Sequence, residues 1–281
     1  MRDAATIPTR PRLVLASALL SSALAVTASS ACRSSPPPPP VDSASRPIEG
    51  RYGVVGIEGI RGFDGLSAAQ REQLKQRRIF WGHQSVGANV MDGTKALGFP
   101  FAQVRSGSDF ETVRWGEAAV AENGDPERKI RSFDAFIAGR GMGARVEAAS
   151  FKFCWIDFED TTDVTALLNR YDAQIRRTQE RNPNLRILHV TPPLTTDEPE
   201  LNAIRWRYGR DLITRYSEDG LVFDLAELMA TQANGAFCWA DGAPRLCDEW
   251  APEGDNGHLN ARGSQRAGKA FLHAFWRLFS S

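Results

Sequence analysis

Residues 78–87 of this chain read RIFWGHQSVG. Residues 78–81, with three consecutive apolar side chains after Arg78, are typical of a short buried β-strand, and Gly82 gives the following turn backbone freedom. A helix is predicted to begin directly after the turn, at Val86, and to continue to Leu97. The segment therefore has the order strand, tight turn, helix, with the hydroxyl of Ser85 on the turn.

The same alternation continues along the rest of the chain. Strands are predicted at residues 78–81, 101–105, 151–158, 185–190 and 221–223, and helices at residues 86–97, 126–138, 164–181, 201–216 and 261–278. Near-continuous apolar strands that alternate with helices indicate a parallel sheet buried on both faces. The sequence therefore predicts an α/β fold, a three-layer α/β/α sandwich with a five-stranded parallel sheet. Ligands of such sheets bind beyond the carboxyl ends of the strands.

Composition excludes one class of partner. The 281 residues include 34 Lys and Arg and 34 Asp and Glu, so the formal net charge is zero. Proteins that bind nucleic acid through its phosphates need a positive excess or a basic stripe, and this sequence has neither. We therefore expect no nucleic-acid partner.

The first 50 residues have the pattern of an export signal and a spacer. A basic head precedes the apolar residues 13–26, and small residues then lead to Cys32. We interpret residues 1–31 as a signal peptide, too short in its apolar part to span a bilayer, with Cys32 as a lipidated N-terminus. Plain secretion or a periplasmic location is the alternative. Residues 32–50 are predicted to be a Pro-rich tether, and residues 51–281 are predicted to be the folded domain. We therefore expect the protein to contact the membrane through the lipid anchor only.

The other three cysteines have two predicted roles. Cys238 and Cys247 flank a turn-rich segment, so in an oxidising compartment they are a candidate local disulfide. Cys154 lies in an apolar run and is interpreted as a buried free thiol. The sequence has no Cys-x-x-Cys pair, and we expect neither a metal nor another cofactor.

Two loops could together carry chemistry. Ser85 follows the first strand, where the N–H groups that open a helix favour an oxyanion. Asp255 and His258 share a loop late in the chain, so the carboxylate can orient the imidazole to take a proton from a serine. The alternatives are a helix-capping serine and a surface turn with an incidental histidine. His83, close to Ser85, could line the crevice or shape the turn.

With a serine after the first strand and DNGHLN at residues 255–260 before the last helix, residues 78–280 resemble the SGNH/GDSL hydrolase superfamily. The resemblance implies a flavodoxin-like sandwich and ester hydrolysis without a metal. It implies that Ser85 is the nucleophile, His258 the base and Asp255 its orienting acid. Gly107 is the candidate for the glycine that binds the oxyanion.

Two departures from the family pattern affect the oxyanion site. The first block, residues 82–85, reads GHQS and is one residue longer than Gly-Asp-Ser. The third block, residues 154–157, reads CWID and lacks the usual asparagine. Asp157 lies in that block and is a candidate crevice residue, but it could bind the oxyanion only if protonated, because an ionised carboxylate accepts hydrogen bonds and cannot donate them. Gln84 is the alternative donor.

The sequence therefore predicts an exported serine esterase, a cell-envelope lipoprotein that hydrolyses acyl esters through Ser85, His258 and Asp255. Acetyl esters are candidate substrates, and the acylated partner is a small molecule or a glycan. The missing asparagine supports an alternative from another class, a catalytically silent lipoprotein of the same fold that binds glycans.

Overall fold

The computed structural model describes residues 53–218 and 220–280. The predicted signal peptide, the lipidated Cys32 and the tether at residues 32–50 lie outside the described residues. Within the described residues, no helix is both long and apolar enough to cross a membrane.

A seven-stranded parallel sheet forms the centre of the fold, with the order β1-β7-β6-β5-β2-β4-β3. The α/β class and the parallel sheet are confirmed, but the predicted number of five strands is wrong. The five inner strands, β4-β2-β5-β6-β7, have the 2-1-3-4-5 order of flavodoxin-like sheets, and the two-residue strands β1 and β3 extend the edges. The strands are β1 (Val54–Val55), β2 (Ile79–His83), β3 (Ala102–Gln103), β4 (Trp115–Ala119), β5 (Ala148–Phe151), β6 (Arg186–Val190) and β7 (Leu221–Phe223).

The neighbour of β2 is a strand that the sequence analysis did not predict. β4 pairs with β2 along its whole length, from Ile79 beside Trp115 to His83 beside Ala119. The predicted strand at residues 101–105 shortens to β3 and pairs with β4 on its far side. The sequence of β4, WGEAA, has a glycine and a glutamate in place of a continuous apolar run. Its small residues fit between two neighbouring strands, and this fit is a tertiary property that local periodicity does not report.

The third predicted strand is displaced. Residues 151–158 were predicted to be extended, but β5 ends at Phe151 and a short 3-10 helix, η3 (Trp155–Asp157), follows. Ser150 donates its hydroxyl proton to the Leu188 carbonyl inside the sheet, so a polar residue is tolerated there (2.6 Å). Phe153 and Phe158 are buried beneath the helices instead. The apolar run therefore marks core packing and not a strand.

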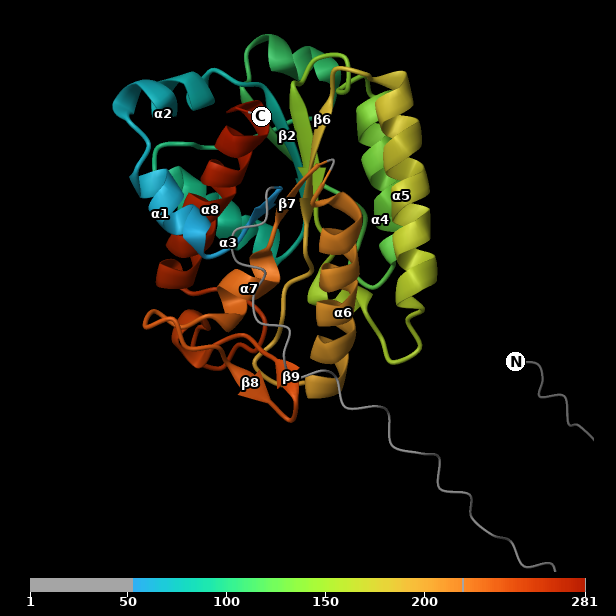
Figure 1. The fold of residues 1–281 in the computed structure, drawn as a ribbon. Coiled ribbons are helices and arrows are strands. Elements are labelled where there is room, and N and C mark those ends of the chain that lie inside the picture. The colour runs from blue at the N-terminus through green and yellow to red at the C-terminus, as the bar shows by residue number, and fades with distance from the viewer. Residues whose placement is uncertain (1–52, 219, 281) are drawn as a thin grey trace, which may run out of the picture. The chain divides into compact units, whose positions relative to one another are not determined.

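Helices cover both faces of the sheet (Figure 1). Within β2, Ile79 and Trp81 belong to one apolar cluster and Phe80 to the other, as alternation in a doubly covered sheet requires. On the first face lie α1 (Glu58–Asp64), α2 (Ala68–Lys75), α3 (Val86–Ala96), α7 (Leu225–Ala230) and α8 (Ala261–Ser280). On the second lie α4 (Pro126–Asp134), α5 (Val164–Arg181) and α6 (Pro199–Tyr216).

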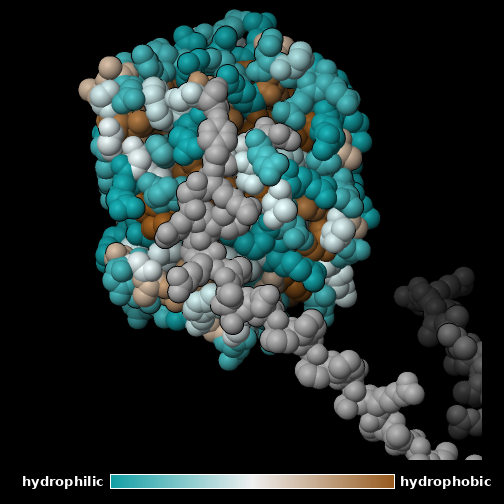
Figure 2. Space-filling model, in the orientation of Figure 1, coloured by the Kyte–Doolittle hydropathy of each residue, from teal (hydrophilic) through white to brown (hydrophobic). Residues whose placement is uncertain are grey.

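A small excursion lies between α7 and α8. It contains the two-stranded hairpin of β8 (Trp239–Ala240) and β9 (Ala243–Pro244). A disulfide joins Cys238 to Cys247 across this hairpin, with the two Cα atoms 5.6 Å apart, and Cys154 is a buried free thiol. The side of the molecule seen in Figure 2 is largely hydrophilic, with hydrophobic residues in the gaps between helices.

Candidate active site

Ser85 lies where β2 turns sharply into α3. Its backbone has φ 52° and ψ −117°, a region that non-glycine residues rarely adopt and that costs on the order of 1–3 kcal/mol. Its side chain makes no capping hydrogen bond to α3. The hydroxyl oxygen lies instead 2.7 Å from His258 Nε2, so the capping alternative does not describe this serine. The turn projects the hydroxyl toward a residue 173 positions further along the chain.

His258 and Asp255 form the second contact of the site. His258 Nδ1 lies 2.7 Å from Asp255 Oδ2, and the other carboxylate oxygen accepts the N–H groups of Gly257 and His258 at 2.9 Å each. Partial burial disfavours the ionised form of Asp255, but these backbone donors and the His258 ring outweigh it and lower the pKa of the carboxyl. An ionised Asp255 holds the proton on Nδ1 and leaves Nε2 to accept the proton of Ser85.

The loop that carries His258 is attached to the rest of the molecule on two sides. The N–H of Leu259 donates to Asn89 Oδ1 on α3 (3.1 Å), and the N–H of Thr196 donates to the Asn256 carbonyl (2.8 Å). Gly257 packs against the Trp155 indole, where a Cβ would lie only 2.5 Å from Nε1. These contacts fix the imidazole over the start of α3. Sequence reasoning missed Asn89 and Trp155 because neither belongs to a recognisable motif.

His83 lies away from the hydroxyl of Ser85. Its ring is almost fully buried, stacks on Trp81 and places Nε2 3.1 Å from Glu117 Oε2. Gly87, in the first turn of α3, packs directly on this ring, and a Cβ there would lie 2.4 Å from the His83 Cβ. Of the two predicted roles, the structure therefore favours the shaping of the turn over the lining of the crevice.

Gly107 does not lie in the loop beside Ser85. It follows β3, which is separated from β2 by β4, and its N–H already donates to the Arg140 carbonyl (2.8 Å). The prediction that Gly107 binds the oxyanion is therefore wrong, because the intervening strand β4 was not recognised. One loop adjacent to Ser85 is that after β4, residues 120–125, and Gln84 Nε2 donates to the Ala121 carbonyl there (2.9 Å). One hydrogen of that amide is thus engaged in holding the two loops together.

Asp157 is an internal clamp. It is buried and pairs with the buried Lys129 at 2.6 Å, and it accepts the N–H groups of Gly124 and Cys154. All of these groups donate to it, so Asp157 has no proton to offer an oxyanion. It ties the loop after β5 to the loop after β4. The prediction of Asp157 as a crevice residue is corrected to this structural role.

The same clamp orients a residue that the sequence analysis did not single out. Lys129 Nζ donates to Asn123 Oδ1 (2.6 Å), which leaves Asn123 Nδ2 without a partner among the described residues. The backbone N–H of Ser85 likewise donates to no group within residues 53–218 and 220–280. Both donors lie in adjoining loops, at the carboxyl ends of the neighbouring strands β2 and β4. Recognition of β4 as a strand would have exposed Asn123-Gly124 as a loop signal at its carboxyl end.

Among the described residues, no group of three or more His, Cys, Asp or Glu side chains is arranged to hold a metal ion. The site offers a serine hydroxyl, a histidine that contacts it and a carboxylate that contacts the histidine.

No family model matches the sequence, and no curated protein matches it. Among solved structures, the fold is similar to a "putative platelet activating factor" from Streptococcus pneumonia, at 15% identity over 77% of this chain and 90% of that one, with a TM-score of 0.46. It is also similar to a "putative lipolytic protein of G-D-S-L family" from Desulfitobacterium hafniense DCB-2, at 10% identity over 70% and 99% of the two chains, with a TM-score of 0.44. At these TM-scores the overlap is partial, and no function follows from it.

Proposed function

We propose that this protein is a serine ester hydrolase that uses Ser85, His258 and Asp255. The observation that carries the proposal is the pair of 2.7 Å contacts, from Ser85 Oγ to His258 Nε2 and from His258 Nδ1 to Asp255 Oδ2. The site lies at the carboxyl end of β2. In the flavodoxin-like order of the inner strands, the connections reverse between β2 and β5, and ligands bind at such a reversal.

The first half of the reaction acylates Ser85. Its oxygen adds to the ester carbonyl carbon while its proton passes to His258 Nε2. Asp255, kept ionised by its backbone donors, stabilises the imidazolium that forms. When the tetrahedral intermediate collapses, the bond to the alcohol oxygen breaks, and His258 returns its proton to that oxygen. The alcohol leaves and the acyl group stays on Ser85.

The second half reverses these steps with water. Water loses a proton to His258 Nε2 and attacks the acyl carbon, and the bond to Ser85 Oγ then breaks as that oxygen regains the proton. The carboxylic acid is released. We assign stabilisation of the oxyanion in both halves to the N–H of Ser85 and to Asn123 Nδ2, which both lack an acceptor among the described residues. Asn123 would take the place of the asparagine missing from residues 154–157.

Two assays test the proposal. Purified protein is expected to hydrolyse p-nitrophenyl acetate and to be labelled by a fluorophosphonate probe. Ser85→Ala should abolish the labelling and reduce turnover by about 10³-fold or more, because it removes the oxygen that forms the acyl-enzyme. Ser108→Ala, a change at an exposed serine elsewhere, is the matched control and should retain both signals. If Ser85→Ala keeps either signal, the assignment is wrong.

We propose acyl esters of small molecules or glycans as the substrates, with acetyl esters as the first class to test. A panel of acetylated glycans and longer acyl esters would rank them by kcat/KM. Absence of turnover on the whole panel, together with saturable binding of a deacylated glycan, would support the silent glycan-binding alternative instead.

We also propose that the domain is exported and anchored through a lipid on Cys32. Cells fed a radiolabelled or alkyne-tagged fatty acid should label the full chain, and Cys32→Ala should remove the label. An unlabelled protein found in the culture medium or periplasm would favour plain secretion.

A further inference from the structure

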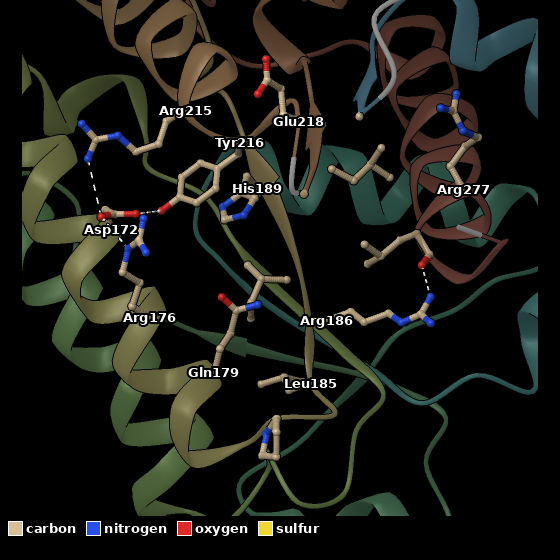
Figure 3. A pocket seen from close by; sticks show the side chains of 16 residues that line it. Asp172, Arg176, Gln179, Leu185, Arg186, His189, Arg215, Tyr216, Glu218 and Arg277 are labelled. Carbon is tan, nitrogen blue, oxygen red and sulfur yellow. Dashed lines mark hydrogen bonds and ion pairs between the residues drawn. The ribbon is translucent and has the colours of Figure 1, made fainter.

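A cavity lies far from Ser85, toward the amino ends of β6 and β7. Its volume is about 550 Å³, within the usual range of small-molecule sites. It is lined by Gly53, by the first residues of β6 and β7 and by the ends of α5, α6 and α8. Since every strand of the sheet is parallel, these amino ends face away from the carboxyl edge that carries Ser85. The cavity is therefore a separate site (Figure 3).

The described lining is rich in positive charge. Four arginines and two acids line the cavity: Arg176, Arg186, Arg215, Arg277, Asp172 and Glu218. Asp172 is already saturated, because it accepts Tyr216 Oη at 2.8 Å and Arg176 Nε at 3.0 Å, with Arg215 3.7 Å away. Arg186 donates only to the backbone carbonyl of Leu278 and pairs with no described carboxylate. The guanidinium charge of Arg186 is therefore available to an anion.

His189 supplies an inward-facing donor on the floor of the cavity. It is 3% exposed, its ring stacks on Tyr216 at 3.6 Å, and its Nδ1 lies 2.8 Å from the Tyr171 hydroxyl. Burial lowers the pKa of His189 to about 3, so the ring is neutral and carries one proton. The hydroxyl has no other acceptor among the described residues, so Tyr171 donates to Nδ1 and the proton of His189 lies on Nε2.

Nothing in the described chain accepts that proton. His189 Nε2 lies beside Gly220, where a Cβ would be 3.4 Å away, and both residues line the cavity. An N–H that opens into a cavity and has no protein acceptor can donate to a bound molecule, so the position favours a ligand with an acceptor oxygen. The guanidinium groups around it favour a charged acceptor, and Arg binds phosphate oxygens with two parallel hydrogen bonds.

We propose that this cavity binds a phosphate group on a small organic ligand, with His189 Nε2 and Arg186 among the donors. The stacked rings of Tyr216 and His189 and the apolar Leu185 and Leu221 provide a surface for the organic part. The volume exceeds the needs of a bare ion and suits a molecule the size of a sugar phosphate. The same group could come from a free phosphate ester or from a phospholipid headgroup.

NMR spectroscopy of the His189 ring tests the proposal directly. The chain has only four histidines, so each can be resolved in ¹⁵N-histidine NMR spectra. Titration with glucose 6-phosphate at constant ionic strength should shift the His189 Nε2 resonance saturably and leave that of His258 in place. Inorganic phosphate should compete. Sedimentation with phosphatidylglycerol vesicles, against phosphatidylcholine vesicles, distinguishes a headgroup from a free ester as the source.

Two variants separate specific binding from general charge. Arg186→Gln should weaken binding about 10-fold or more, because it removes a charge-assisted donor. Arg207→Gln, on an exposed part of α6 that does not line the cavity, should change binding less than twofold. Thermal unfolding of each variant checks the fold. Ser85→Ala should bind like the parent protein, so failure of the esterase proposal would leave this one intact. No saturable shift of His189 with any of these phosphates, or equal weakening by both arginine variants, would overturn it.

Discussion

Two histidines of this domain, one in a loop beyond the sheet and one buried inside it, have opposite surroundings. At the carboxyl edge, the side chain of His258 is 39% exposed and contacts a carboxylate on one side and a hydroxyl on the other. Inside β6, His189 is 3% exposed, and its neighbours are the Tyr171 hydroxyl and the Tyr216 ring, with no hydrogen-bonded carboxylate among the described residues. A carboxylate partner stabilises an imidazolium, whereas burial without one keeps the ring neutral. His258 is therefore equipped to take up a proton during a reaction, and His189 to donate a hydrogen bond without changing its charge.

The strongest test of this contrast removes the carboxylate that contacts His258. Asp255→Asn keeps the shape of the loop but can hold the imidazole in the wrong tautomer and cannot stabilise its charged form. We expect kcat to fall by about 10³- to 10⁴-fold with little change in KM. Steady-state kinetics on p-nitrophenyl acetate measure both constants.

A nearby acid provides the control for that variant. Asp248 pairs with Arg245 on the surface of the same excursion and contacts neither His258 nor Ser85. Asp248→Asn should leave kcat within about twofold of the parent value. Equal losses in the two variants would show that general loosening of the segment, and not the tautomer of His258, explains the effect.

A substitution of Asn123 tests the proposed stabilisation of the oxyanion at the site of Ser85. Asn123→Ala removes the Nδ2 donor and should lower kcat by about 10²- to 10³-fold, the usual effect of losing one oxyanion donor. Because Lys129 also loses an acceptor, the thermal unfolding midpoint must be measured beside the kinetics. Asn234→Ala, at an exposed asparagine, is the control. An Asn123→Ala enzyme with full kcat would place the donor elsewhere.

The neutral state of His189 has a consequence for stability in acid. The unfolded chain protonates this histidine near pH 6.5, whereas the folded chain does so only near pH 3. Between these values the unfolded state binds the extra proton, so the free energy of unfolding falls as the pH falls, by about 1.4 kcal/mol per unit at most. Urea unfolding at pH 7, 6 and 5 should show a steeper acid loss in the parent than in His189→Gln. NMR spectra with an imidazolium at His189 at pH 5 would contradict the prediction.

Glu227, which lies near the carboxyl ends of the strands, changes the stability with pH in the opposite direction to His189. Burial and then the neighbouring Asp224 and Glu58 raise its pKa from 4.5 to about 8. Between those values the folded state keeps a proton that the unfolded state releases, so stability falls as the pH rises through this window. Glu227→Gln retains an oxygen for the N–H of Ile57 and should stabilise the protein at pH 9 by on the order of 1 kcal/mol. Denaturant unfolding at pH 5 and pH 9 measures this change in stability. Glu200→Gln, at an exposed glutamate, is the control and should leave the free energy of unfolding unchanged.

The parts of the site that the sequence predicted well are local. Asp255 and His258 are three positions apart in a loop rich in turn residues, so their contact needs only one turn of chain. Ser85 could be placed on a strand-to-helix turn because an apolar run ends at one side and an amphipathic segment begins at the other. Cys238 and Cys247 are separated by nine positions, and the disulfide between them closes a short loop.

The wrong predictions share one origin: local sequence patterns do not report which elements lie side by side in the fold. β4 carries Gly116 and Glu117, which no local rule assigns to the centre of a sheet, and its omission moved the expected oxyanion loop to Gly107. Asp157 appeared as a candidate crevice residue because its partner Lys129 is 28 positions away in the sequence. Pairing across such separations depends on which elements pack together.

The sequence by itself determined the alternation of strands and helices, the turn that presents Ser85 and the pairing of Asp255 with His258. These features follow from the conformational preferences and contacts of residues close together in the chain. Only the tertiary structure decided that β4 lies beside β2, that Asp157 and Lys129 share a buried clamp, and that His189 faces a cavity lined by arginines. Burial, and with it the protonation of a side chain, depends on neighbours that the fold brings from distant parts of the chain.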